Sequence, residues 1–368
     1  MKRSARITIH PDALQHNLKR AKEIAPNSKV NAVIKANAYG HGAIETAGIL
    51  YEITDGFAVS CIPEAVELRQ SGIDKPLTVL QGHQSINDLR IAEAYKLRLT
   101  IHEDRQLSLL NQFSPAKNGF HFDLNVKIDS GMHRLGFDPS RCHDIYSKLK
   151  NHIYVNPENI ILMTHLSCAD EIDNDFTSQQ LSTFDRACKK ISAPKSIANS
   201  AGILGWQESH ADWIRPGIML FGSSPFTSSN RDTHKLKASM TFNAPVIAIH
   251  KLSKGDSIGY GATWTCPKNL KVAVIACGYA DGYPRHASSG SPVWLNGQEV
   301  KLVGRVSMDM IIVELDGFNE NQDNRLQIGD LAELWGENIN IDQVAQSADT
   351  ISYELLCNAG NLCDKMGN

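Results

Sequence analysis

The chain has 368 residues, a formal net charge of −3 and a charged fraction of 21%. This length predicts about two domains, at roughly 150 residues for each. The nearly balanced charge excludes the basic footprint of a protein that binds nucleic acid or an anionic membrane. No apolar run approaches the ~18 residues that a membrane helix needs, and the basic start MKRSARITIHPD lacks the apolar core of a signal peptide. We therefore expect a cytoplasmic protein that binds neither nucleic acid nor membrane.

The cysteines are scattered along the chain, without a C-x-x-C pair or a close grouping with histidine. Thiols in this pattern predict no metal site and are typical of reduced structural cysteines in a reducing compartment. The eight are Cys61, Cys142, Cys168, Cys188, Cys266, Cys277, Cys357 and Cys363.

The first part of the chain alternates between strand-like and helix-like segments. Pro11 suits a first helical turn, and the apolar spacing of Leu14, Leu18 and Ile24 predicts a helix over residues 11–25. Strand-like runs follow at residues 30–36, 55–62, 76–81, 97–102, 119–128, 159–166, 195–200 and 213–221. Alternation with helices predicts a parallel sheet. Eight such units favour an α/β fold, a (β/α)8 TIM-like barrel, and a doubly wound open sheet is the main alternative.

After the last predicted strand the composition changes. Residues 223–235 are polar and loop-like, and the remainder reads as short β-rich runs separated by turn signals. One of these signals, Asn296-Gly297, lies between two apolar runs and predicts a β-hairpin. We expect a barrel over residues 8–228 and a mostly β domain over residues 229–368, with which residues 1–8 are able to pair.

The ends of the predicted strands carry the polar residues that would serve a barrel enzyme, because barrel active sites lie at the C-terminal ends of the strands. Lys35 follows the first apolar run and immediately precedes the glycine-rich segment ANAYGHG. Barrel enzymes often hold a phosphate after strands seven and eight, where this chain has Ser200 and the backbone around Gly217. A lysine beside such a site either clamps the phosphate or forms an imine with pyridoxal phosphate, and burial favours its reactive neutral amine.

Nine segments, in order through nearly the whole chain, carry a more specific resemblance. The sequence resembles the alanine racemases, which use pyridoxal phosphate and combine a barrel with a β domain. The matching segments are AVIKANAYGHG (32–42), VKIDSGMHRLGF (126–137), THLSCAD (164–170), ANSAG (198–202), WIRPGIMLFG (213–222), GYGATW (259–264), GYADGYPR (278–285), GRVSMDM (304–310) and SYELLC (352–357).

The resemblance implies two catalytic bases on opposite faces of the cofactor ring. Lys35 would form the imine with pyridoxal phosphate and act on one face. Tyr260 would act on the other face, from the partner subunit of a homodimer with shared active sites. Both side chains have reference pKa values near 10, so a working site must lower them.

The resemblance also implies supporting and binding roles. Arg215 would donate to the pyridine nitrogen, His165 would orient Arg215 and Tyr260, and a carbamylated Lys127 would fix Arg134. The residues implied for the phosphate are Tyr39, Ser200, Gly217, Ile218 and Tyr353. The residues implied for the substrate are Arg134, Met308 and Asp309, with Tyr279 in the access path.

The activity implied by the resemblance is interconversion of L- and D-alanine, supplying D-alanine for peptidoglycan synthesis. A broad-specificity amino-acid racemase on the same scaffold is one alternative. A non-catalytic carrier of pyridoxal phosphate is another, although such carriers resemble the barrel alone. Amino-acid decarboxylases share the fold type but need a different apparatus on the substrate side.

Overall fold

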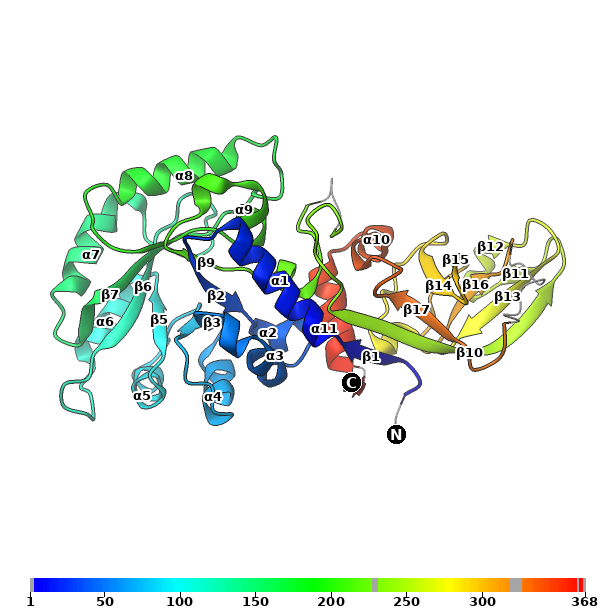
Figure 1. Cartoon of the computed structure of the whole chain (residues 1–368), viewed down its shortest axis with the longest axis horizontal. Coiled ribbons are helices and arrows are strands. Elements are labelled where there is room, and N and C mark those ends of the chain that lie inside the picture. Colours follow the sequence, from blue (N-terminus) through cyan, green and yellow to red (C-terminus); the bar gives the residue numbers. More distant parts are fainter. Residues whose placement is uncertain (1–2, 227–230, 318–325, 363, 367–368) are drawn as a thin grey trace.

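The computed structural model describes residues 3–226, 231–317, 326–362 and 364–366. Figure 1 shows an elongated molecule, with a barrel at one end and an antiparallel β-sheet at the other. Cys363 and part of the polar segment 223–235 lie outside the described residues. Within the described ranges, no helix combines the length and the apolar character that crossing a membrane requires.

The barrel is closed, and each neighbouring pair of its strands is parallel. Closure through pairing of its first and last strands confirms the predicted barrel and excludes the open sheet. The strands are β2 (Lys29–Val33), β3 (Gly56–Val59), β4 (Leu77–Val79), β5 (Arg98–Ile101), β6 (Phe122–Lys127), β7 (Val155–Met163), β8 (Lys195–Ser196) and β9 (Trp213–Ile214).

Helices surround the barrel, and their buried faces carry the apolar residues that the sequence pattern predicts. In the first of them, α1 (Pro11–Ile24), Leu14 and Leu18 are fully buried. The others are α3 (Ala43–Leu50), α4 (Ile62–Gln70), α5 (Ile86–Tyr95), α6 (Asp104–Gln112), α7 (Cys142–Lys150), α8 (Phe176–Ala187) and the short α9 (Ser200–Gly205).

The segment after β2, labelled α2 (Lys35–Tyr39), is a left-handed turn. Four successive residues, Ala36 to Tyr39, have φ between 51° and 53°. L-residues pay about 1–2 kcal/mol each in this conformation, so the surrounding structure must hold the turn. Glu64 accepts a hydrogen bond from the Ala36 amide at 2.7 Å, and the Asn37 side chain accepts one from the Ala43 amide at 2.9 Å. The strain is concentrated immediately after Lys35.

The second body is an eight-stranded sheet, with strand order β13-β16-β15-β14-β17-β10-β1-β18. Its central strand is the long β10 (Met240–Leu252), which pairs with β1 (Arg6–Ile9) from the start of the chain. The remaining strands are β13 (Leu270–Ile275), β14 (Pro292–Leu295), β15 (Gln298–Leu302), β16 (Ile311–Glu314), β17 (Leu331–Trp335) and β18 (Asp364–Met366), with a separate pair β11 (Ser257–Ile258) and β12 (Trp264–Thr265).

The predicted β-hairpin is confirmed. Strands β14 and β15 pair antiparallel, and they are joined by Asn296 and Gly297 with φ of 50° and 86°. A two-residue hairpin turn of this kind needs positive φ at both central positions, which asparagine and glycine tolerate.

Two helices, α10 (Ile341–Ser347) and α11 (Ser352–Leu362), follow the sheet. Figure 1 shows α11 between the barrel and the sheet. Its contact with the barrel is close, because an added Cβ on Gly360 would lie 2.1 Å from the Gly40 carbonyl oxygen. Gly40 has φ of 84°, which favours glycine. The crossing places Tyr353, on the first turn of α11, beside the left-handed turn, with 6.0 Å between the ring centroids of Tyr39 and Tyr353.

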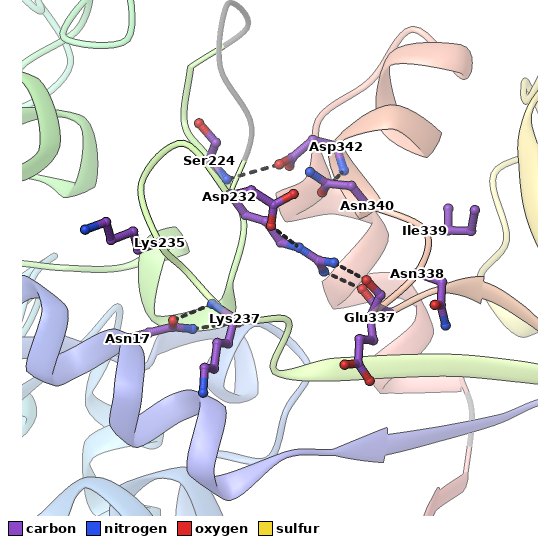
Figure 2. Close-up of polar contacts among 12 residues, drawn as sticks. Asn17, Ser224, Asp232, Lys235, Lys237, Glu337, Asn338, Ile339, Asn340 and Asp342 are labelled. Carbon is purple, nitrogen blue, oxygen red and sulfur yellow. Dashed lines mark hydrogen bonds and ion pairs between the residues drawn. The ribbon is translucent and has the colours of Figure 1, made fainter.

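Polar contacts join the two bodies where the chain leaves the barrel (Figure 2). Asn17 of α1 bonds both the amide and the carbonyl of Lys237 at 2.8 Å. The Ser224 amide donates to the Asp342 carboxylate at 3.1 Å. The segment between the barrel and the sheet is therefore hydrogen bonded to α1 of the barrel through Lys237 and to α10 through Ser224.

Six of the described cysteines form no disulfide: Cys61, Cys142, Cys168, Cys188, Cys266 and Cys357. Two of them, Cys142 and Cys188, are buried with 4.0 Å between their sulfur atoms, beyond the length of a disulfide.

Candidate active site

The C-terminal ends of the barrel strands surround a cavity of about 690 Å³. Ten of the fourteen residues that the sequence analysis selects line it, although they come from six different segments of the chain. They are Lys35, Tyr39, Lys127, Arg134, His165, Ser200, Arg215, Gly217, Ile218 and Tyr353.

Lys35 lies two residues beyond the end of β2, where the left-handed turn begins. Burial, and secondarily the cation of Arg134, lowers the pKa of Lys35 below its usual value, while the Glu64 carboxylate acts in the opposite direction. A lysine whose charge is disfavoured more readily supplies the neutral amine that a base or a nucleophile needs. The Glu64 carboxylate is held in place by the Ser60 and Ala36 amides, both at 2.7 Å.

A cradle of hydroxyls and backbone lies between the ends of β8 and β9. The Ser200 hydroxyl accepts hydrogen bonds from the Gly217 amide at 2.9 Å and the Met219 amide at 3.3 Å. A Cβ added to Gly217 would lie 2.7 Å from the Tyr39 hydroxyl oxygen, so a side chain at this position would fill the cradle. Ile218 begins a 3-10 turn, and the first amides of such a turn have no acceptor within it. Hydroxyls and backbone amides at the start of such a turn are suited to an anion such as phosphate.

Arg215 also lines the cavity, and it is held by several hydrogen bonds. Its guanidinium donates to the Ser196 hydroxyl at 2.6 Å and to the Thr164 carbonyl at 2.7 Å, and Nη2 lies 3.4 Å from Nδ1 of His165. Burial lowers the pKa of Arg215 to about 10, so the guanidinium stays charged at neutral pH.

Burial, together with the nearby cation of Arg215, lowers the pKa of His165 well below its ordinary value. The imidazole is therefore neutral, and its Nδ1 can accept a hydrogen bond from Arg215. The position of His165, two residues beyond β7, matches the strand-end rule on which the sequence analysis depends.

Lys127 ends β6 and is buried among cations. Burial, and then the charges of Arg215 and Arg134, lowers the pKa of Lys127 to about 8. Among the described residues Lys127 makes no ion pair, because the neighbouring Asp129 instead accepts the Gly131 and His133 amides, both at 3.0 Å. A buried amine that titrates near neutrality can react with carbon dioxide, and the resulting anion would offset the surrounding positive charge.

The other four expected residues do not line the cavity of their own chain. They lie on turns of the sheet domain, far along the sequence from the barrel. Tyr260 is 71% exposed and Met308 is 53% exposed. Tyr279 and Asp309 are exposed as well. The two turns that carry them are adjacent, because the Tyr279 amide donates a hydrogen bond to the Ser307 carbonyl at 3.1 Å.

The cavity also contains residues that the sequence analysis did not select, among them Gln81, Asp170 and Ile351. Gln81 lies beyond the end of β4, so the strand-end rule could have found it. Asp170 lies within the quoted segment THLSCAD, and Ile351 precedes α11, a helix that the β-rich interpretation of this region did not predict.

Comparison with known proteins finds relatives of one family for both the barrel and the sheet domain. The family model for the alanine racemase N-terminal domain matches residues 9–225, and the model for the alanine racemase C-terminal domain matches residues 239–366. An alanine racemase from Halorhodospira halophila is 44% identical over 357 residues, which cover 97% of this chain and 96% of that protein.

Solved structures agree with this. The biosynthetic alanine racemase from Pseudomonas aeruginosa superimposes with a TM-score of 0.93 at 37% identity, and 100% of each chain is covered. The alanine racemase from Bartonella henselae, solved with covalently bound pyridoxal phosphate, gives a TM-score of 0.85 at 26% identity, with 99% of each chain covered.

Proposed function

Because the chain belongs to the alanine racemase family, we propose that it interconverts L-alanine and D-alanine with pyridoxal phosphate as its cofactor. The observation that carries the proposal is the placement of Lys35. A lysine with a depressed pKa lies in the same cavity as the hydroxyl and amide cradle around Ser200 and Gly217. That pairing fits a group with an aldehyde at one end and a phosphate at the other.

The residues of the cavity fit this cofactor. Tyr39, Ser200, Gly217, Ile218 and Tyr353 would hold the phosphate, and Arg215 would donate to the pyridine nitrogen. When bound, pyridoxal phosphate withdraws electrons from the Cα–H bond of the substrate. Since arginine does not give up a full proton, the ring nitrogen would stay unprotonated, which limits electron withdrawal and disfavours side reactions such as transamination.

Racemisation requires that a proton leave one face of Cα and return to the other. Lys35 Nζ would hold the proton on one face. Tyr260 would hold it on the opposite face, and because Tyr260 lies outside the cavity of its own chain, it would have to come from a second copy. We therefore propose a homodimer with two shared sites, in which Tyr279 lies along the access path.

The substrate carboxylate would bind Arg134, which has no described hydrogen-bond partner of its own. A carbamate on Lys127 would orient Arg134 by a charge-assisted hydrogen bond. Met308 and Asp309 of the second copy would close the substrate side and leave room for a methyl group.

We also propose a division into a cofactor-binding barrel over residues 8–228 and a mostly β domain over residues 229–368, with residues 1–8 pairing with the latter. The antiparallel pairing of β1 with β10 supports this assignment of the N-terminus. The cellular role proposed is the supply of D-alanine for peptidoglycan synthesis in the cytoplasm.

The proposal is tested by incubating the purified protein, loaded with pyridoxal phosphate, with each enantiomer of alanine. Chiral chromatography should show both reactions approaching an equal mixture, because enantiomers have equal free energies. Parallel reactions with L-serine and L-lysine measure breadth. Turnover of lysine as fast as alanine would favour the broad-specificity racemase, and no interconversion of any of the three would refute the proposal.

A further inference from the structure

Arg3 connects three parts of the chain that are far apart in sequence. It precedes β1, and its guanidinium reaches two turns of the sheet domain. Nε and Nη2 donate to the two oxygens of Asp281, with Nη2 to Oδ2 at 3.1 Å, and Nη2 also donates to Asp309 at 2.6 Å. These hydrogen bonds raise the pKa of Arg3, so its charge is constant over any working pH.

The two carboxylates differ in how firmly they are held. Asp281 is 1% exposed and accepts a hydrogen bond from the Gly278 amide at 2.9 Å. Gly278 packs directly on the neighbouring turn, since an added Cβ would lie 2.3 Å from the carbonyl oxygens of Ser307 and Met308. Asp309 projects from that turn, and about half of its side chain is exposed. Arg3 therefore connects an exposed carboxylate to a buried, rigid one.

The charge of Asp309 matters because of what the cavity contains. Lys35, Lys127, Arg134 and Arg215 all line the cavity, which suits a substrate carboxylate. An uncompensated carboxylate at the mouth of such a cavity would repel that substrate and would compete with it for Arg134.

We propose that Arg3 is a positioning residue that holds and neutralises Asp309, and that it thereby sets the affinity of the shared site for the substrate carboxylate. The inference rests on the proposed function, in which Asp309 faces the cavity of a second copy. Arginine suits this role because its planar fork binds both oxygens of Asp281 and still reaches Asp309, whereas a lysine ammonium is a single point charge.

The experiment uses the full-length, cofactor-loaded protein and compares Arg3→Ala, Arg3→Lys, Asp309→Asn and the double variant Arg3→Ala/Asp309→Asn. For Arg3→Ala we expect KM for alanine to rise about fivefold, the size of one partly screened charge near a binding site, while kcat changes less than KM. Arg3→Lys should lie between wild type and Arg3→Ala. Asp309→Asn should lower KM, and the double variant should return KM close to the wild-type value.

A second measurement does not depend on turnover. Propanoate is alanine without its amino group, so its dissociation constant, measured by calorimetry, reports carboxylate recognition alone. It should change in the same order as KM across the variants. Lys19→Ala, which removes an exposed cation from α1, controls for net charge and should leave both quantities at wild-type values.

The outcomes separate this inference from the proposed function. If wild type racemises alanine but Arg3→Ala keeps KM and the propanoate constant within about twofold, Arg3 is not a positioning residue. If the double variant is as impaired as Arg3→Ala, Arg3 supports the turn and not the charge of Asp309. Loss of the dimer in Arg3→Ala would equally overturn the inference, because Arg3 would then act in assembly. A wild type without racemase activity is a failure of the proposed function instead.

Discussion

The barrel cavity and the turns of the sheet domain present opposite surroundings to the residues expected to act together. In the cavity, Arg215 is 4% exposed and Lys127 is 8% exposed, and burial changes the pKa of each. On the turns, Tyr260 is 71% exposed and Met308 is 53% exposed. Large apolar and aromatic side chains grouped on exposed turns are typical of a surface that another chain covers. This difference supports the proposal that the barrel cavity contains one part of the active site and that the turns of a second copy supply the rest.

The largest expected effect comes from removing the amine of Lys35 from the barrel cavity. Lys35→Ala should lower kcat/KM by at least about a thousandfold, the scale of losing a positioned acid–base group, while far-UV circular dichroism stays unchanged because Lys35 is not part of the apolar core. Borohydride reduction of the wild type, followed by peptide mapping, should attach the cofactor to Lys35. A label on any other lysine would show that Lys35 is not the residue that forms the imine.

A mixing experiment tests whether the two regions meet across chains. Lys35→Ala and Tyr260→Phe homodimers should each be nearly inactive. In a mixed dimer one site carries both defects and the other carries neither, so random exchange should restore about a quarter of wild-type activity for an isologous dimer. If Tyr260 instead acts within its own chain, every site keeps one defect. Absence of recovery, with exchange confirmed by mass spectrometry, would exclude the shared site.

The same comparison explains which parts were predictable from sequence. The eight barrel strands were predictable, because fully buried strands such as β3 (Gly56–Val59) form continuous apolar runs bounded by turns. Lys35, Ser200 and Gly217 followed from the rule that barrel chemistry lies at strand ends, whereas the resemblance to a family supplied the other cavity residues. The shared-site residues did not follow from any such rule, since exposure on a turn has no periodic signal, and the resemblance to a family supplied them.

Some structure was not predictable even at the strand ends. The glycines of ANAYGHG predict a tight turn after Lys35, but Ala36 to Tyr39 adopt left-handed backbone as well. Local propensity does not favour this conformation for alanine. It is held by contacts distant in sequence, namely Glu64 on α4 and the crossing of α11 at Gly360, and single-sequence patterns do not contain these.

Lys127 provides a test of how the cavity accommodates the positive charges of Lys35, Arg134 and Arg215. With a pKa of about 8, about half of Lys127 is neutral amine at pH 8, and the fraction falls as the pH decreases. Only the neutral amine reacts with carbon dioxide. Bicarbonate labelled with carbon-13 should therefore give a carbamate signal in NMR above about pH 8, and the signal should disappear below about pH 6.5.

Lys127→Arg is the matched control, because it keeps the cation and should give no carbamate signal. Lys127→Ala should lower kcat/KM on the order of 30-fold, about 2 kcal/mol, which is the cost of removing one partner of a buried charge pair. A labelled signal in Lys127→Arg, or none in wild type at pH 8.5, would contradict carbamylation.

The smallest expected effect is on the affinity for the cofactor, and it comes from a substitution at Gly217 beside Tyr39 and Ser200. In Gly217→Ala the new Cβ would lie 2.7 Å from the Tyr39 hydroxyl oxygen, and Tyr39 cannot move freely because it is 6% exposed and stacks on Phe221 at 4.6 Å. Overpacking of about 1–3 kcal/mol should weaken pyridoxal phosphate binding about tenfold, measured by absorbance titration of the cofactor-free protein. Gly48→Ala is the control, since it lies in α3 with open space around its Cβ and should be neutral or stabilising by up to about 1 kcal/mol. Unchanged cofactor affinity in Gly217→Ala would mean that the phosphate does not occupy the space between Tyr39, Ser200 and Gly217.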